Sequence, residues 1–177
     1  MYYYNKNKLK IAGLVEESIV DGPGIRFVVF TQGCPHDCKG CHNPQTHDFN
    51  LGEYINIDDL AKRINSNPLL KGVTLSGGEP FMQCEALVEL ISKLNNNLDI
   101  ITYSGFTFEE IVKKANNENR FMDLLNYTDI LIDGRFEEEK KDENLAFRGS
   151  SNQRAINVKL SLKNKEIIEY EFWIKLE

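Results

Sequence analysis

The sequence predicts an α/β fold with a mainly parallel sheet that ends in an antiparallel hairpin. Short runs of β-branched and aromatic residues alternate with segments of helical periodicity, which is typical of right-handed β–α–β units. A glycine closely follows each of the predicted parallel strands. The 177 residues predict one domain, residues 1–177, at roughly 150 residues per domain. An eight-stranded barrel typically takes ~250 residues, so a partial barrel or a short open sheet fits this length.

The strands are predicted from runs rich in β-branched and aromatic residues that end at turn residues. The four parallel strands are predicted at residues 25–31, 72–76, 99–103 and 129–133. The tail departs from the alternation, because residues 155–160 and 167–173 are both strand-like and have Lys163-Asn164-Lys165 between them. This spacing predicts the antiparallel hairpin at the end of the sheet.

The helices are predicted where apolar residues recur at helical spacing. Residues 57–64 form the first, with Asn56 as a candidate N-cap. Residues 84–94 form the second, and its apolar stripe consists of Leu87, Leu90, Ile91 and Leu94. Thr107 and Glu110 form a capping box, which predicts the start of another helix.

Several glycine-containing turns come directly after predicted strands. They are a cysteine-rich loop, Gly77-Gly78, Ser104-Gly105 and Asp133-Gly134. In barrels and open sheets alike, ligands bind at the carboxyl ends of parallel strands. We therefore expect these turns to converge on one rim.

The composition is that of a soluble globular protein, with 41% hydrophobic and 27% charged residues. The formal net charge of −6 argues against binding to duplex nucleic acid, which usually needs a basic face. No apolar stretch approaches the ~20 residues of a membrane span, and the first residues lack the apolar core of a signal peptide. We therefore expect a cytoplasmic protein without a membrane or nucleic-acid partner.

The cysteines are unevenly placed, with Cys34, Cys38 and Cys41 within eight residues and Cys84 alone. A disulfide framework would spread its cysteines more widely, so this pattern indicates a metal site. The C-x3-C-x2-C spacing can hold three corners of a [4Fe–4S] cluster, with Gly40 easing the turn. Because a closed cluster uses four cysteines, three leave one iron open as a substrate-binding site.

A structural zinc ion is the alternative for this loop. Zinc accepts Cys₃His sites, and His36, His42 and His47 are each candidates for the fourth ligand. Cys84 could complete either kind of site, although at the start of a helix it is better explained as a small hydrophobic residue.

Two motifs in order resemble the radical S-adenosylmethionine (SAM) superfamily: the cysteine motif after one strand, and Ser76-Gly77-Gly78-Glu79-Pro80 after the next. Upstream, Asp21-Gly22-Pro23-Gly24-Ile25-Arg26 resembles the segment before the cluster in activating enzymes of glycyl-radical enzymes. Downstream, Asp133-Gly134-Arg135-Phe136 and the run from Phe147 to Arg154 are similar to the anaerobic ribonucleoside-triphosphate reductase activating proteins. The resemblance covers about residues 21–154 and implies a partial (βα) barrel of the radical SAM type.

The resemblance also implies an activity. Cys34, Cys38 and Cys41 would ligate the cluster, and an electron from it would cleave SAM to methionine and a 5′-deoxyadenosyl radical. That radical would then generate a glycyl radical on the partner. The implied partners are the large glycyl-radical subunit of anaerobic ribonucleotide reductase and an electron donor such as reduced flavodoxin.

Further residues are implied as SAM contacts. Gly77, Gly78 and Glu79 suit the methionine end, because the glycines permit close approach and the carboxylate accepts from the ammonium group. Gly40, Cys41 and His42 would lie against SAM, with His42 in place of the aromatic residue that many members carry before the third cysteine. The remaining candidates are Ser104 for the ribose, Arg148 for the carboxylate, Asn152 for ribose or adenine, and Asp133. Each also has an ordinary explanation as a turn or surface residue.

Two other functions compete with this one. One is a different radical SAM activity, either the activating enzyme of another glycyl-radical enzyme or a small-molecule enzyme such as a carboxy-deazaguanine synthase. The other is a zinc-stapled protein-binding module, which would be colourless and would not bind SAM.

Overall fold

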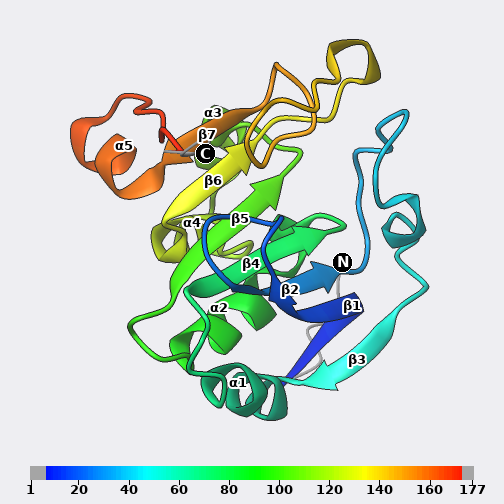
Figure 1. Cartoon of the computed structure of the whole chain (residues 1–177), viewed down its shortest axis with the longest axis vertical. Helices are drawn as coiled ribbons and strands as arrows, with labels where there is room; N and C mark the ends of the chain where they lie inside the picture. The colour runs from blue at the N-terminus through cyan, green and yellow to red at the C-terminus, as the bar shows by residue number, and fades with distance from the viewer. Residues whose placement is uncertain (1–6, 173–177) are drawn as a thin grey trace.

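A computed structural model describes residues 7–172 as one open seven-stranded sheet with helices on one side (Figure 1). The strands lie in the order β3-β1-β2-β4-β5-β6-β7. Their bounds are β1 Lys8–Ser18, β2 Arg26–Thr31, β3 Glu53–Asn56, β4 Gly72–Gly77, β5 Asp99–Ser104, β6 Ile130–Asp133 and β7 Arg154–Asn157. The helices are α1 Ile57–Asn65, α2 Cys84–Ser92, α3 Phe108–Lys114, α4 Phe121–Tyr127 and α5 Val158–Asn164.

The predicted parallel core of the sheet is confirmed, because β2, β4, β5 and β6 pair in parallel. The described strands leave the sheet open, with β3 and β7 at its edges, so the partial barrel is not confirmed. At one edge, β1 pairs antiparallel with β2 and with β3. Sequence patterns did not predict β1. This strand buries few apolar side chains, and its residues 15–17 are all exposed, so it lacks the apolar run of a typical strand.

The predicted C-terminal hairpin is formed only in part, because a helix replaces its short loop and the two segments pair at a single antiparallel bridge. β7 ends at Asn157, whose side chain caps α5 by accepting a hydrogen bond from the backbone N–H of Leu160 at 3.1 Å. Residues 158–160 therefore begin a helix, and β7 pairs antiparallel with β6. The segment from residue 167 to 172 meets β7 through a single bridge between Ile156 and Glu169. Trp173, the last residue of the predicted hairpin, lies outside the described residues.

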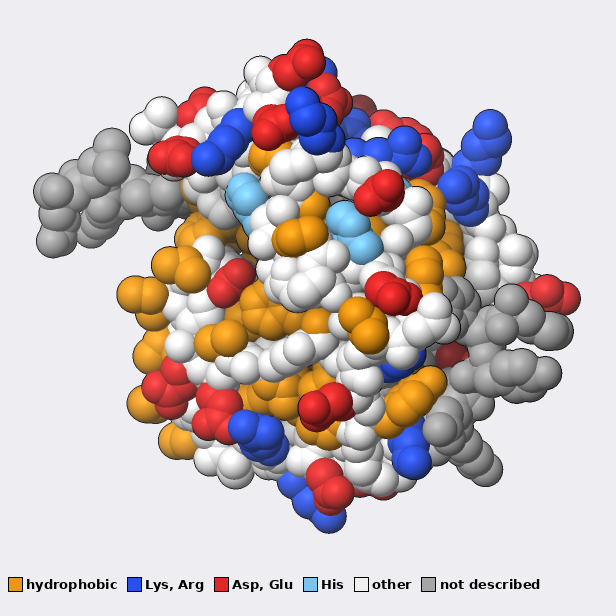
Figure 2. All heavy atoms as spheres, turned by 90° about the vertical axis from the view of Figure 1, so that its right-hand side faces the viewer, with side chains coloured by type: hydrophobic (Ala, Val, Ile, Leu, Met, Phe, Trp, Pro, Cys, Tyr) orange, Lys and Arg blue, Asp and Glu red, His pale blue; other side chains and the backbone are white. Residues whose placement is uncertain are grey.

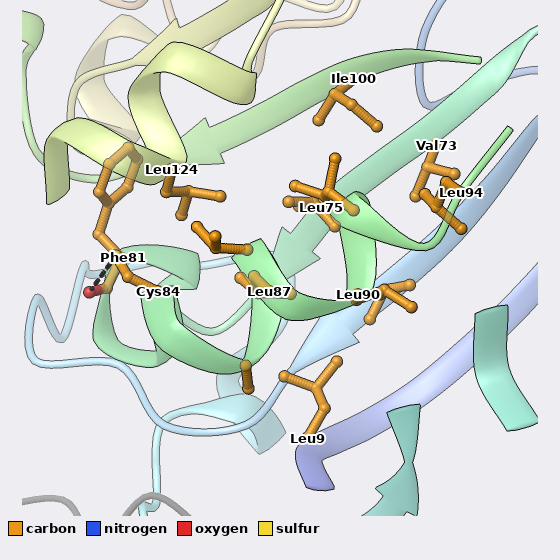
Figure 3. Packing of buried hydrophobic residues seen from close by; sticks show 14 of the residues in the cluster. Leu9, Val73, Leu75, Phe81, Cys84, Leu87, Leu90, Leu94, Ile100 and Leu124 are labelled. Atoms are coloured by element: carbon orange, nitrogen blue, oxygen red, sulfur yellow. Dashed lines mark hydrogen bonds between the residues drawn. The ribbon is translucent and has the colours of Figure 1, made fainter. Parts of the chain in front are cut away.

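The main hydrophobic core lies between the sheet and the layer of α1, α2 and α4. Figure 3 shows Leu87 and Leu90 of α2 facing Val73 and Leu75 of β4. The predicted apolar stripe of α2 is thus confirmed, as are the Asn56 cap of α1 and the capping box of α3. Cys84 is buried in this core, and its thiol donates to the carbonyl of Phe81 at 3.2 Å.

The opposite face of the sheet carries a smaller apolar cluster, formed by Ile101, Ile130, Ile132 and Ala155. The loop between β1 and β2 packs against this face, and the hydroxyl of Thr74 donates to the carbonyl of Asp21 at 2.8 Å. No helix in residues 7–172 is both long and apolar enough to span a membrane.

Arg26 ties this loop to the sheet. Its side chain is fully buried, and its guanidinium lies 2.6 Å from a carboxylate oxygen of Asp99. It also donates to the hydroxyl of Thr74 at 2.7 Å and to the carbonyl of Val73 at 2.9 Å. Because a buried arginine needs partners for its donors, this network holds the starts of β2, β4 and β5 together.

We expect Arg26→Met to lower the free energy of unfolding by about 2–4 kcal/mol, since it removes donors from buried carbonyls and unpairs a partly buried carboxylate. Urea denaturation measures this change. Arg63→Met is the matched control, because Arg63 pairs with Glu16 on the surface and both side chains are about half exposed. Its loss should cost less than about 1 kcal/mol. Equal losses in the two variants would contradict a structural role for Arg26.

Candidate functional site

A cavity of about 530 Å³ opens at the carboxyl ends of the central strands. Its wall takes residues from the ends of β2, β4 and β5, from the loops that follow them and from the loop after β6. The turns predicted to converge do so, because the wall contains Cys34, Cys41, Gly77, Gly78, Ser104, Gly105 and Gly134. In Figure 1 the loops after β2 and β6 rise beyond these strand ends.

The loop after β2 presents the three clustered cysteines. All three are free and half-buried. Cys34 and Cys41 lie in the cavity wall, and the backbone N–H of Asn43 donates to the Cys41 sulfur at 3.4 Å. Backbone hydrogen bonds also reach Cys34 from His36 and Cys38 from Phe136. Each sulfur therefore faces an amide donor, an arrangement that stabilises thiolates and tunes cluster potentials.

Burial makes two of the thiols, Cys34 and Cys38, hard to ionise without a positive centre nearby. Burial raises the pKa of Cys34 to about 11, and burial also raises the pKa of Cys38. The backbone hydrogen bonds only partly offset these shifts. Since metals bind the deprotonated ligand, iron would supply the missing charge. Three neighbouring thiols, each with an amide donor and two of them in the cavity wall, fit a cluster with one iron open toward that cavity.

The zinc alternative finds less support in this geometry. The candidate histidines have other partners: His36 contacts Glu79, His47 contacts Asp37, and His42 packs against the ring of Phe136 at 5.0 Å.

Glu79 joins three loops of the site. Its carboxylate is fully buried and accepts from the Nε2 of His36 at 2.7 Å, in the cysteine loop. It also accepts from the hydroxyl of Ser104 at 3.0 Å and from the backbone N–H of Gly105 at 2.8 Å, after β5. A fourth donor, the N–H of Phe81, lies 3.0 Å away in its own turn. We call this set of contacts the Glu79 clasp.

The side chain of His36 is buried among several contacts. Its side chain is 3% exposed, and its ring meets the edge of Phe106 at 4.5 Å. Arg135 donates to Nδ1 at 3.3 Å while Nε2 faces Glu79, so these partners place the ring proton on Nε2. A side chain at Gly105 would fall on the ring, which explains the glycine there.

The glycines after β4 have a backbone role. The N–H of Gly78 donates to the carbonyl of Thr31, and the N–H of Glu79 donates to the carbonyl of Gly33, both at 2.8 Å. A Cβ at Gly78 would collide with the backbone of Gly33. The structure thus shows a close backbone contact between the glycine turn and the cysteine loop, whereas the predicted approach of Gly77-Gly78 to SAM stays a prediction.

The segment after β6 also supports the cysteine loop. The amide of Phe136 bonds the Cys38 sulfur, and Arg135 contacts His36. The hydroxyl of Tyr103 donates to the carbonyl of Phe147 at 2.8 Å and so fixes the far end of the same segment.

The structure places four of the predicted cofactor-contacting residues outside the cavity wall: Gly40, Glu79, Asp133 and Asn152. The oxygens of Glu79 are already taken by the clasp. Asp133 is buried and pairs with Arg154 at 2.5 Å while accepting from the N–H of Phe108. Asn152 donates to the carbonyl of Arg135 at 2.8 Å. These three side chains therefore serve the fold around the site.

The wall does include the other predicted SAM contacts, which are Cys41, His42, Gly77, Gly78, Ser104 and Arg148. Of the other two predicted cluster ligands, Cys34 lies in the wall and Cys38 lies outside it. Arg148 is the only Lys or Arg among the wall residues, and its buried Nε has no hydrogen-bond partner. Sequence patterns missed Asp21, Tyr103, Phe136 and Phe147, which also line the cavity. Asp21, Phe136 and Phe147 belong to the sequence motifs at residues 21–26, 133–136 and 147–154. The spacing of residues in such a motif does not show which side chains of a loop point into a cavity.

Comparison with known proteins supports the chemistry of the cysteine loop. The family of 4Fe–4S single cluster domains matches residues 20–156. Proteins named anaerobic ribonucleoside-triphosphate reductase-activating protein match 76% of the chain. That of Haemophilus influenzae is 33% identical and covered over 89% of its length. Those of Enterobacteria phage T4 and Escherichia coli K12 are 34% and 32% identical, with 85% and 90% covered.

Among solved structures, QueE from Escherichia coli is similar, with a TM-score of 0.45 and 19% sequence identity. The similarity covers 60% of this chain and 56% of QueE. At this level it carries no conclusion about fold or activity.

We expect His36→Phe to lower the free energy of unfolding of the cluster-free protein by about 1–3 kcal/mol, because buried Glu79 loses a donor while the ring volume is kept. Cluster affinity should also fall about 10- to 100-fold, the usual effect of removing a contact behind the metal ligands. Urea denaturation and iron titration measure the two effects.

His47→Phe is the matched control, since His47 faces the exposed carboxylate of Asp37 at 3.4 Å. It should cost less than about 1 kcal/mol. A His36→Phe protein as stable as this control would argue against the Glu79 clasp.

Proposed function

Since the chain belongs to the family of anaerobic ribonucleoside-triphosphate reductase-activating proteins and carries their 4Fe–4S single cluster domain, we propose that it activates such a reductase by radical SAM chemistry. It would reductively cleave SAM and generate a glycyl radical on the large reductase subunit. The observation that carries this proposal is the loop of three free thiols after β2, two of which, Cys34 and Cys41, line a cavity of about 530 Å³. That volume lies in the range of roughly 300–1,000 Å³ typical of small-molecule sites.

When bound, the cluster would supply one electron to SAM, which would break the sulfonium C–S bond and give methionine and a 5′-deoxyadenosyl radical. Transfer of a hydrogen atom from the glycine to this radical would leave 5′-deoxyadenosine and the glycyl radical. The protein's part is to hold, orient and shield these groups. Cys34, Cys38 and Cys41 would ligate three irons. The Glu79 clasp would keep the cysteine loop against the turn at Gly77-Gly78, so that the open iron faces the cavity.

The charges of the wall suit a zwitterionic ligand. Asp21 and Arg148 are its one Asp and its one Arg, so they could meet the ammonium and carboxylate groups of the methionine part. The unpartnered Nε of Arg148 gives this residue a free donor. Exposed backbone at Gly77 and Gly78, the hydroxyl of Ser104 and the ring of His42 remain our candidates for the other contacts.

The proposal includes a one-electron donor, such as reduced flavodoxin, and a cytoplasmic site of action. Because the radical must not meet water, the open cavity should be closed by the reductase during turnover. Competing radical SAM activities differ in their substrate, so the identity of the activated partner separates them.

We expect Cys38→Ala to abolish cluster assembly and SAM cleavage, because one corner of the cluster loses its ligand. The experiment is anaerobic reconstitution with iron and sulfide, followed by dithionite reduction with SAM. Iron and sulfide content, visible absorption and 5′-deoxyadenosine are measured.

Cys84→Ala is the matched control, since this thiol is buried in the core away from the cavity. It should keep the cluster and the cleavage activity. A colourless wild-type protein that holds zinc and leaves SAM intact would overturn the proposed function.

We expect Arg148→Gln to raise the KM for SAM about 10- to 100-fold, the effect of losing a charged hydrogen bond worth about 1.5–3 kcal/mol. The cluster should remain intact by absorption. Arg120→Gln is the control, because Arg120 pairs with Asp123 at 2.7 Å in a partly exposed position outside the cavity wall. An unchanged KM for Arg148→Gln would remove this residue from the SAM site.

A further inference from the structure

Two adjacent apolar side chains project from the loop between β1 and β2. Within residues 7–172, Ile19 and Val20 are the most exposed large hydrophobic residues, each at 74%. Single exposed apolar residues are common, but a contiguous pair of β-branched side chains is a feature of interaction surfaces.

This exposure is built into a well-anchored loop. The hydroxyl of Ser18 donates to the carboxylate of Asp21 at 2.5 Å and accepts from the N–H of Val20 at 3.3 Å. The carbonyl of Asp21 accepts from Thr74 in the middle of the sheet at 2.8 Å. Gly22, the next residue, packs close to the side chains of Arg26 and Ile101. The loop therefore presents Ile19 and Val20 in a defined position.

That position is the opening of the cavity. Val20 is strongly exposed and also belongs to the cavity wall, so it must lie where the cavity meets solvent. The wall also contains Leu145 and Phe147 of the segment after β6. Apolar side chains thus come to this cavity from two loops far apart in the sequence. Figure 2 shows the right-hand side of the molecule of Figure 1, where acidic and basic side chains gather at the top, above the histidines.

The size of the cavity limits what can enter it. About 530 Å³ is the space of one small-molecule ligand. With SAM inside, a protein substrate could insert little more than a short backbone segment with a small residue. Most of the contact area between the two proteins must therefore lie outside, on the rim.

We propose that Ile19 and Val20 form a docking surface for the reductase, contacting apolar side chains that flank the residue to be activated. This inference rests on the proposed function, which requires a reductase segment to reach the cavity. Burying the two side chains would provide binding energy and would exclude water from the opening. We expect the segment of the reductase that binds this surface to be apolar, because the side chains it would contact are apolar.

The experiment compares Ile19→Ser with Leu69→Ser in the reconstituted enzyme. Ile19 is not in the cavity wall, and Leu69 is a similarly exposed residue (62%) that also lies outside it. Three quantities are measured: 5′-deoxyadenosine formed without reductase, glycyl radical formed at increasing reductase concentration, and direct binding of the cluster-free protein to the reductase.

We expect Ile19→Ser to weaken binding and raise the KM for the reductase about tenfold, a usual effect for a central apolar contact. SAM cleavage without reductase should be unchanged, and Leu69→Ser should match wild type in all three measurements. Val20→Ser in addition to Ile19→Ser should weaken reductase binding further.

Three results would overturn the docking surface while leaving the proposed function intact. The first is reductase binding equal to wild type in the Ile19→Ser protein. The second is an equal loss in Leu69→Ser. The third is a wild-type dimer that Ile19→Ser dissociates, which would assign the surface to a second copy of this chain. A wild-type protein that does not cleave SAM would instead contradict the proposed function itself.

Discussion

The buried carboxylate of Glu79 is the contact on which the rest of the site depends. It accepts four hydrogen bonds from three separate segments: the cysteine loop, its own turn after β4 and the turn after β5. A buried carboxylate is tolerated only when its oxygens are satisfied, so the fold cannot release one segment without leaving a costly unpaired charge. The cysteine loop, with no regular structure around its three thiols, takes its place from this clasp.

Neighbouring residues of the turn after β4 have different roles. The backbone of Gly77-Gly78 faces the cavity, while the side chain of Glu79 turns inward and binds the neighbouring loops. A similar division holds after β6, where Asp133 and Asn152 support the fold and the amide of Phe136 reaches the Cys38 sulfur. Residues around the cysteine motif thus shape the thiol environment largely through backbone amides, which hold their position better than long side chains.

The open sheet explains why the site is accessible. Strands β1 and β7 pair antiparallel at the two sides of the parallel core, and loops cover only part of the free face. The cavity therefore remains open beside Val20. This opening suits the proposed action on a reductase, because the partner itself could complete the enclosure. Arg26 keeps the loop that carries Val20 joined to the starts of the central strands.

Local pattern by itself determined the four parallel strands, the helices at Asn56 and Thr107, the burial of the α2 stripe and the convergence of the glycine turns. Each of these follows from periodicity, capping or the direction of parallel strands, which neighbouring residues encode. Tertiary structure decided the rest. Residues 158–160, predicted as strand, instead begin α5, because Asn157 caps this helix and Val158 packs into the main core. The inward turn of Glu79 and the burial of His36 depend on loops 43 residues apart meeting in space, and no local pattern specifies which side of a loop will face a partner.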